Sequence, residues 1–320
     1  MDTISIERYS PAQRAEWDDF VARSRNGTFL LQRGYMDYHS DRFRDCSWMA
    51  YQNGKLRALL PANIDDSGVL HSHQGLTYGG WITPMGHLDG EDLLEIFGQA
   101  IEVWHKEGIK ELDYKRIPYI YSKTPADEDL YALFRLGAVR TGCGLSSAID
   151  LRDGIAFNQM QRRHLRKSQA LPLIISEETN VAAFMGLLTE CLQERHGVNP
   201  VHTCEEMQML RDRFPQNIRA FVLKLDGEAA PQAGVCVYDT ETVAHAQYIA
   251  TTPQARKLNL LTPLFHHLIS EVFAGRRYYD FGISTEDNGN YLNTGLLRQK
   301  FSYGGTGVTY DRYSLKFRRF

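Results

Sequence analysis

Two kinds of hydrophobic spacing alternate along the second half of the chain. Short apolar runs are typical of buried strands, and apolar residues three and four positions apart are typical of amphipathic helices. Residues 181–192 have the helical spacing, and Gly197 follows as a stop signal. A further helix is expected after Thr203, because Thr203 and Glu206 form the T-x-x-E pattern of a capping box. Strands are expected at residues 171–177, 219–225, 232–238, 243–250, 277–283 and 308–315.

The turns between these strands indicate an antiparallel meander followed by a crossover. Asp226-Gly227 is a hairpin signal, so the strands that flank it are expected to pair in opposite directions. Pro253 is expected to break the chain before a helix at residues 260–273. A helix between two strands usually forms a parallel crossover, so the strands before and after this helix are expected to be parallel neighbours. A last helix is expected at residues 290–303, with Asn290 as its cap.

The first half of the chain repeats this order of elements, β-α-α-β-β-β-α-β-α-β, with little identity of residues. Its strands are expected at residues 4–8, 47–52, 55–63, 69–73, 110–115 and 146–151, and its helices at residues 12–22, 35–43, 91–104 and 127–134. We therefore expect an α/β (α+β) fold with mixed sheets, built from two tandem domains at residues 1–152 and 153–320.

Composition narrows the class of protein. Apolar residues make up 43% and charged residues 23% of the 320, a balance that is typical of a globular protein and not of a disordered or fibrous one. The chain has no apolar run long enough for a membrane-spanning helix, its start lacks the pattern of a signal peptide, and its five cysteines show no CxxC pairing. We therefore expect a reduced, cytoplasmic protein without an integral membrane segment. The net charge is only -3, so contact with nucleic acid would need a local basic patch.

The element order and three motifs resemble a known superfamily. The motifs are RRHLRKSQ at 162–169, AQYIATTPQARKLNLLTPLFHHLI at 246–269, and YDFGIS at 279–284 with GLLRQKFSYGG at 295–305. Together they resemble the GNAT acyltransferases, and in particular the tandem-GNAT, Fem-like aminoacyltransferases that build peptidoglycan interpeptide bridges. The resemblance implies transfer of an acyl group from a thioester or an aminoacyl ester to a primary amine.

One stretch departs from the GNAT pattern. GNAT acetyltransferases carry a sequence like R-x-x-G-x-G/A before the crossover helix, where glycines let backbone N–H groups approach the pyrophosphate of coenzyme A. Here the corresponding residues 254–261 contain no glycine. The departure favours a Fem-like donor, aminoacyl-tRNA, and leaves acetyl-CoA or another acyl-CoA open. No tightly bound cofactor is expected with either donor.

A polar turn follows the strand at residues 277–283. The resemblance implies that Asp280 and Gly282 lie where the central sheet opens, so Ser284, Asn293 and their neighbours are expected to line a ligand-binding gap. The same residue types also suffice to build a turn and a helix cap, and the sequence supports both interpretations equally.

Lys300 lies on the helix after this turn, in a segment that resembles the part of the Fem family that carries a lysine implicated in acyl transfer. A cation there would stabilise an oxyanion or hold the donor, whereas most lysines are simply solvated. The acceptor amine must lose a proton, and Glu286 or a water molecule near Tyr78 is the expected base.

Two further groups of residues are candidates for ligand binding. Arg162 and Arg166 share one face of an expected helix and suit phosphate recognition, although a solvated charged face is the commoner outcome. His71 and His73 share one face of a strand, but no carboxylate or cysteine partner is evident in the sequence, so no metal site is expected.

The function that we expect is transfer of an aminoacyl or acyl group to a primary amine, on a small molecule or a cell-wall precursor, and tRNA is a candidate partner. Two alternatives stay open. The first is an acetyl-CoA-dependent N-acetyltransferase of a small molecule, and the second is a catalytically inactive GNAT-like binding module. The sequence does not indicate the oligomeric state.

Overall fold

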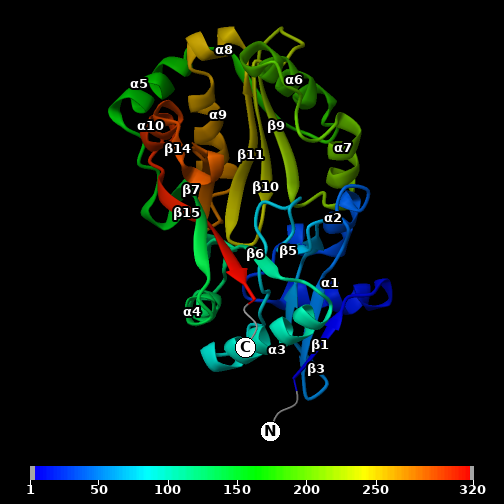
Figure 1. Cartoon of the computed structure of the whole chain (residues 1–320). Helices are drawn as coiled ribbons and strands as arrows, with labels where there is room; N and C mark the ends of the chain where they lie inside the picture. The colour runs from blue at the N-terminus through cyan, green and yellow to red at the C-terminus, as the bar shows by residue number, and fades with distance from the viewer. Residues whose placement is uncertain (1–3, 318–320) are drawn as a thin grey trace. The chain divides into compact units, whose positions relative to one another are not determined.

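The computed structural model describes residues 4–317 and divides the chain into two compact units (Figure 1). The second unit contains Leu145–Ser284 and Leu292–Val308. The first unit contains the chain before Leu145, the short segment Thr285–Tyr291 and the chain from Thr309 onward. The first unit therefore includes two segments from the end of the chain.

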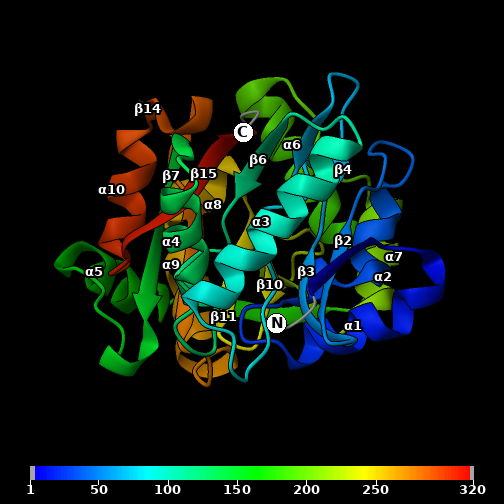
Figure 2. The ribbon, with the colours of Figure 1, turned by 60° about the horizontal axis from the view of Figure 1, so that its bottom comes forward.

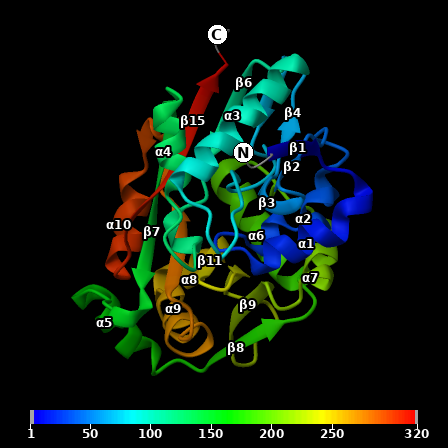
Figure 3. The same cartoon turned by 90° about the horizontal axis from the view of Figure 1, so that it is seen from below.

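The first unit combines a small sheet with a mixed one. Its strands are β1 (Ile4–Arg8), β2 (Trp48–Gln52), β3 (Lys55–Leu60), β4 (Asn63–Ile64), β5 (Val69–His71) and β6 (Glu111–Lys115), with parts of β7 (Val139–Asp150) and β15 (Thr306–Lys316). Its helices are α1 (Arg14–Arg23), α2 (Arg33–Met36), α3 (Gly90–Lys106) and α4 (Glu128–Arg135). Strands β1, β2 and β3 form an antiparallel sheet. Strands β5 and β6 are parallel and joined through α3, and β15 pairs antiparallel with β6. Figures 2 and 3 show α3 beside β6.

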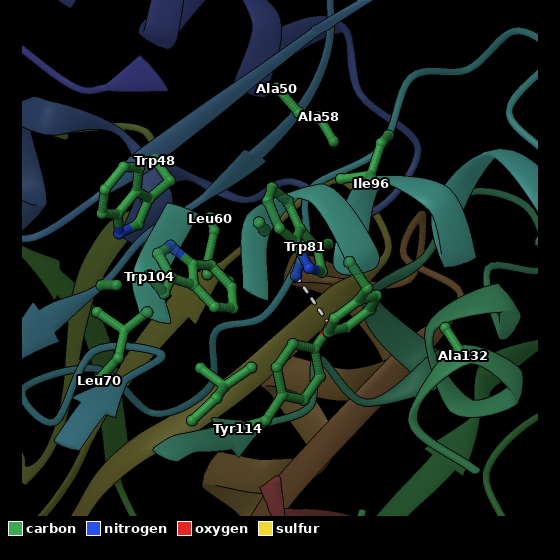
Figure 4. Close-up of a cluster of buried hydrophobic side chains, with 14 of the residues drawn as sticks. Trp48, Ala50, Ala58, Leu60, Leu70, Trp81, Ile96, Trp104, Tyr114 and Ala132 are labelled. Atoms are coloured by element: carbon green, nitrogen blue, oxygen red, sulfur yellow. Dashed lines mark hydrogen bonds between the residues drawn. The ribbon is translucent and has the colours of Figure 1, made fainter. Parts of the chain in front are cut away.

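Aromatic side chains dominate the core of the first unit. Trp48, Trp81, Trp104 and Tyr114 are all buried in one cluster between α3 and the strands (Figure 4). The Tyr114 hydroxyl accepts a hydrogen bond from the backbone N–H of Trp81 at 2.9 Å and donates one to the carboxylate of Asp129 at 3.0 Å. Because this buried hydroxyl has both a donor and an acceptor as partners, its burial in the aromatic core leaves no hydrogen bond unmade.

The second unit contains the expected meander and crossover. Its further strands are β8 (Leu173–Glu178), β9 (Ile218–Leu225), β10 (Ala233–Asp239), β11 (Val243–Thr251) and β12 (Tyr278–Ile283). Its helices are α5 (Gln159–Ser168), α6 (Ala182–His196), α7 (Cys204–Arg213), α8 (Pro253–Leu258), α9 (Leu261–His267) and α10 (Thr294–Ser302). The strands run in the order β7-β12-β11-β10-β9-β8, and β11 and β12 are parallel neighbours, which confirms the predicted crossover. The short strands β13 (Thr285–Glu286) and β14 (Tyr291–Leu292) lie between β12 and α10 in the chain.

Helices cover both faces of the meander in the second unit. Gly234 on β10 faces α6, because an added Cβ at Gly234 would lie 2.8 Å from the ring of Phe184. Its neighbour Val235 points to the other face and belongs to the core cluster that contains Leu264 and Phe265 of α9. Figure 1 shows α6 and α9 on the two sides of strands β10 and β11.

Two sequence-based expectations for this unit were wrong in detail. Pro253 does not simply interrupt the chain but begins helix α8, because proline fits the first helical position and Thr252 caps the helix through a hydrogen bond from the N–H of Ala255. The last helix begins at Thr294 instead of residue 290, and its cap is Asn293, whose side chain accepts from the N–H of Leu296 at 3.0 Å.

Candidate active site

The parallel strands β11 and β12 separate after a short paired stretch. Val243, Ala244 and His245 pair with Tyr278, Tyr279 and Asp280, and the register of the two strands ends there. The pairing of β10 with β11 shifts by one residue between Cys236 and Val237. Such a bulge bends a strand and increases its twist, so β11 turns away from β12 just beyond the last residue that pairs with it.

A cavity of about 400 Å³ lies where these strands have separated. It is lined by residues of α6, β11, the α8 to α9 segment, β12 and α10, namely Arg195, Ile249, Thr251, Ala255, Arg256, Asn259, Leu261, Phe265, Phe281, Leu296, Gln299, Lys300 and Tyr303. Apolar and aromatic residues such as Leu261, Phe265 and Phe281 share the lining with polar and charged ones. This combination is typical of a site that binds an organic ligand and fixes its orientation with a small number of polar contacts.

All charged groups that line this cavity within residues 4–317 are cations. Arg195 donates to the Thr251 hydroxyl at 3.4 Å, and Arg256 donates to the Thr251 carbonyl at 2.9 Å while pairing with Glu194 at 3.1 Å. Lys300 is the third cation. A cavity of about 440 Å³ in the first unit has Glu16 and other residues of both charge signs in its wall, so it lacks this bias. The cavity in the second unit therefore suits an anionic ligand.

Lys300 is buried and bound to the end of β12. Its side-chain nitrogen donates to the carbonyl oxygens of Gly282 and Ile283, each at 2.7 Å. Burial lowers the pKa of Lys300 to about 8, and the negative charge of Asp280 opposes part of that shift. An ammonium group has three N–H donors, so the two carbonyls leave one donor of the charged form for a further partner.

The stretch that departs from the GNAT glycine pattern is largely helical. Residues 253–258 form α8, and Asn259 adopts the left-handed conformation with φ of 57° before α9 begins. The Asn259 side chain also lines the cavity. Position 259 thus keeps a backbone conformation that glycine favours, but with a side chain that occupies space at the wall.

Asp280 organises a second polar cluster, which consists of Ser146, His245, Asp280 and Gly282. The Asp280 carboxylate is fully buried and accepts three hydrogen bonds. They come from the Ser146 hydroxyl at 2.5 Å, the N–H of Gly282 at 3.1 Å and Nδ1 of His245 at 2.8 Å. Gly282 has φ of 77°, a left-handed conformation that favours glycine.

The structure brings several predicted site residues together in the second unit. Gly282 links Asp280 and Lys300, because its N–H donates to Asp280 and its carbonyl accepts from Lys300. Ser284 is buried beside them in the chain, with its N–H bonded to the carbonyl of Leu145 at 2.7 Å. Asn293 donates its N–H to the carbonyl of Ser284 at 2.9 Å and caps α10. The polar residues therefore form a turn and the N-cap of α10, and α10 is the helix that carries Lys300.

Arg162 and Arg166 lie on α5, as predicted, and both are exposed. The helix is anchored by the buried Gln161, which donates to the Ser302 hydroxyl at 2.8 Å and accepts from the Thr262 hydroxyl at 2.6 Å. Because Ser302 and Thr262 belong to α10 and α9, the basic helix is fixed to two elements that form the cavity wall.

Tyr78 and Glu286 belong to the first unit. Tyr78 is buried and its hydroxyl lies 3.0 Å from that of Thr28, whereas Glu286 is exposed. Their roles at an acceptor site stay predictions.

His71 and His73, the two histidines that the sequence places on one strand face, lie in different environments in the first unit. His71 lies between the carboxylates of Asp65 and Asp113, each 2.7 Å from a ring nitrogen, and burial lowers the pKa of His73 to about 3. No group of three or more His, Cys, Asp and Glu residues is placed to hold a metal ion within residues 4–317. Over the same range, no helix is long and apolar enough to cross a membrane.

Sequence reasoning missed Arg195, Arg256 and His245. Arg195 and Arg256 are separated by 61 positions and lie on different helices, so no local pattern connects them. His245 is an isolated histidine in an apolar strand, and its partner Asp280 is 35 residues away. The only signal for His245 in the sequence was the predicted pairing of the two strands, which places it beside Asp280.

Comparisons with known proteins identify the fold. Residues 157–291 match the family model described as "Acetyltransferase (GNAT) domain". A search of curated proteins gives no significant match. The structure of FemX aligns over 98% of this chain and 97% of its own, with a TM-score of 0.70 and 12% identity. L-PGS from Bacillus licheniformis aligns over 98% of this chain and 94% of its own, with a TM-score of 0.59 and 14% identity. A tandem GNAT protein from the clavulanic acid biosynthesis pathway aligns over 98% of both chains, with a TM-score of 0.54 and 14% identity.

The chain therefore has the tandem GNAT fold. This confirms the fold class and the Fem-like resemblance predicted from the motifs. At these levels of identity the solved structures are similar in fold, and the activity has to be argued from the site.

Proposed function

We propose that this protein is an acyltransferase that moves an acyl group from an activated, phosphate-bearing donor to a primary amine. The observation that carries the proposal is the cavity at the separation of β11 and β12, whose charged lining residues Arg195, Arg256 and Lys300 are all cations. An activated acyl donor such as a coenzyme A thioester or an aminoacyl-tRNA carries phosphate groups on the part of the molecule that becomes the leaving group. A cavity whose lining combines apolar residues with cations is complementary to that chemistry.

The donor that we favour is an aminoacyl-tRNA, with a cell-wall precursor amine as acceptor. Helix α8 replaces the glycine loop that holds the coenzyme A pyrophosphate in GNAT acetyltransferases, and the Asn259 side chain stands at the wall. The exposed arginines Arg162 and Arg166 on the adjoining helix α5 offer contacts to further phosphates of a large polyanion.

The second candidate is an N-acetyltransferase that uses acetyl-CoA and a small amine. It is favoured by the match of residues 157–291 to an acetyltransferase domain family. In both candidates Arg195 and Arg256 bind phosphate, and the third N–H of Lys300 stabilises the oxyanion that forms when the amine attacks. Asp280, Gly282, Ser284 and Asn293 keep Lys300 and the end of β12 in place.

The test combines ligand binding with transfer. Thermal shifts are measured with coenzyme A, acetyl-CoA, uncharged tRNA and alanyl-tRNA, because a ligand at 100 times its dissociation constant raises stability by about 2.7 kcal/mol. Transfer of radiolabelled acyl groups from the two charged donors is then measured with a mixture of small amines and cell-wall precursors. We expect binding and transfer with one donor class.

Matched charge variants show whether the binding uses the cavity. Arg195→Gln and Arg256→Gln each remove a cation that lines it, whereas Lys257→Gln removes an exposed cation from the same helix as Arg256 without changing the lining. Loss of a hydrogen bond to a charged group costs about 1.5–3 kcal/mol, so each cavity variant should weaken donor binding by roughly 10-fold or more. Equal affinities in all three variants would contradict the proposed donor site, and binding without transfer would favour the inactive binding module.

A further inference from the structure

His245 has a hydrogen-bond arrangement that defines which of its ring nitrogens carries the proton. Its Nδ1 lies 2.8 Å from the Asp280 carboxylate, which can only accept hydrogen bonds when it is ionised. Nδ1 therefore carries the hydrogen, and in the neutral ring Nε2 keeps its lone pair. Within residues 4–317 no protein group forms a hydrogen bond with Nε2, and the side chain keeps 11% of its surface exposed. The ring thus keeps the Nε2 lone pair available on a side chain that is partly exposed.

The position of His245 in the sheet is as informative as its partners. It is the last residue of β11 that pairs with β12, so it lies at the point where the two strands begin to separate. Its Cε1 would be 3.5 Å from a Cβ added to Gly282. The carbonyl of this same glycine accepts the hydrogen bond from Lys300. His245 and Lys300 therefore both contact Gly282, at the strand end beside the cavity.

Asp280 is held so firmly that it can orient the ring. It is fully buried, and its other carboxylate oxygen accepts from both the Ser146 hydroxyl and the N–H of Gly282. A carboxylate that is fixed in this way keeps an imidazole in one orientation and one tautomer, and it stabilises the imidazolium that forms when the ring takes up a proton.

We propose that Nε2 of His245 is the base that accepts the proton of the acceptor amine, and that Asp280 and Ser146 are its positioning residues. The inference rests on the proposed acyltransferase function and replaces Glu286 as the base. The amine nitrogen attacks the acyl carbon and forms the new C–N bond, while the carbonyl electron pair moves to oxygen. Collapse of the tetrahedral intermediate breaks the C–S bond of a thioester or the C–O bond of an aminoacyl ester. The proton from the amine moves to Nε2, and His245 returns it to the leaving sulfur or oxygen.

The experiment measures transfer from acetyl-CoA and from alanyl-tRNA to ethylamine and to the less basic trifluoroethylamine. His245→Asn is the main variant, because its amide can still donate to Asp280 but offers no basic nitrogen in the place of Nε2. Asp280→Asn tests the positioning role, Glu286→Gln tests the competing base, and His267→Gln is the control. His267 is a partly exposed histidine of α9 whose ring pairs with Glu271, whereas the ring of His245 pairs with Asp280.

General acid–base catalysis typically contributes on the order of 100-fold or more in rate, so His245→Asn should lose about that factor in turnover. Its thermal shift with acetyl-CoA or alanyl-tRNA should match that of the wild type, because donor binding does not use the base. The loss should be smaller for trifluoroethylamine than for ethylamine, since a weakly basic amine gives up its proton more readily. A side chain that only supports the fold would slow both amines equally. Asp280→Asn should show the same dependence on the amine, which loss of folding alone would not produce.

The outcomes separate the two proposals. If the wild type transfers the acyl group and His245→Asn retains nearly all of the turnover, the assignment of His245 is overturned and the acyltransferase function stands. The assignment of His245 is also overturned if Glu286→Gln is the only variant that loses turnover and shows the dependence on the amine. If the wild type transfers nothing from either donor to these amines or to the wider acceptor mixture, the acyltransferase function itself is refuted, and the role of His245 falls with it.

Discussion

Replacing Lys300 with Met separates the contribution of its charge from that of its size. Met fills most of the same volume but leaves the carbonyls of Gly282 and Ile283 without the donor that binds both at 2.7 Å. An unpaired buried acceptor costs about 1–3 kcal/mol. The substitution also removes a buried charge, and the drop in the pKa of Lys300 from 10.5 to about 8 corresponds to a burial cost of about 3 kcal/mol. Near pH 7 the two effects largely offset each other.

The difference in unfolding free energy between the wild type and Lys300→Met changes with pH, and the direction of the change follows from proton binding. Between pH 8 and 10.5 the unfolded chain still binds a proton at Lys300 and the folded chain does not, so wild-type stability rises with pH over this range. The neutral amine keeps two N–H groups, enough for both carbonyls. Lys300→Met has no such titration, so the difference in unfolding free energy between wild type and variant should grow by about 3 kcal/mol from pH 7 to pH 10.5.

Unfolding is followed by circular dichroism against temperature and denaturant at several pH values in this range. Lys257→Met, at an exposed lysine of α8, is the control, and its difference from wild type should stay flat. A flat difference for Lys300→Met as well would refute the reasoning from burial. Turnover of the same variant at pH 7 tests the predicted catalytic role, because loss of an oxyanion-stabilising group costs about 100-fold in rate. Near-normal turnover would leave Lys300 as a support for the strand end only.

Three further substitutions test individual features. Thr252→Ala removes the cap of α8 and should lower stability by about 1 kcal/mol in thermal unfolding, whereas an unchanged midpoint would mean that Pro253 alone starts the helix. Gly282→Ala places a Cβ on a residue with φ of 77° and should cost about 1–2 kcal/mol, measured in the same way, unless the backbone can relax. Two carboxylates raise the pKa of His71, so its contribution to stability is present below pH 6.5 and is lost as the pH rises through the raised value. His71→Gln should abolish that alkaline loss in a pH series of unfolding curves, and an unaltered series would contradict the ion pairs.

Local signals predicted much of the second unit correctly. The capping box of Thr203 and Glu206 is formed at α7, and Gly197 ends α6 in the left-handed conformation. The parallel pairing of β11 and β12 followed from the helix between them. These predictions succeeded because each depends on residues close together in the sequence, or on a rule of chain connection that has few exceptions.

Other features depend on contacts that no local pattern contains. Strand β7 begins at Val139, whereas the strand predicted from the sequence began at residue 146, because its neighbours in the sheet, β12 and β15, come from distant parts of the chain. The segment after Thr309 joins the first unit through pairing of β15 with β6, nearly 200 positions away in the sequence. Asp113 on β6 illustrates the consequence, since its bidentate partner is Arg312 on β15. A prediction that divides the sequence into two consecutive halves cannot contain this pairing.

The polar turn after β12 shows why sequence alone left structure and function equally supported. When β11 turns away beyond His245, the end of β12 loses its neighbour on that side, and its peptide groups need other partners. Lys300 supplies donors to two of the carbonyls, and Asp280 accepts the N–H of Gly282. The same opening that makes room for a ligand therefore requires polar side chains to replace the missing strand. Residues that satisfy the backbone at this position necessarily stand beside the cavity, so a structural role is the reason that they are available for chemistry.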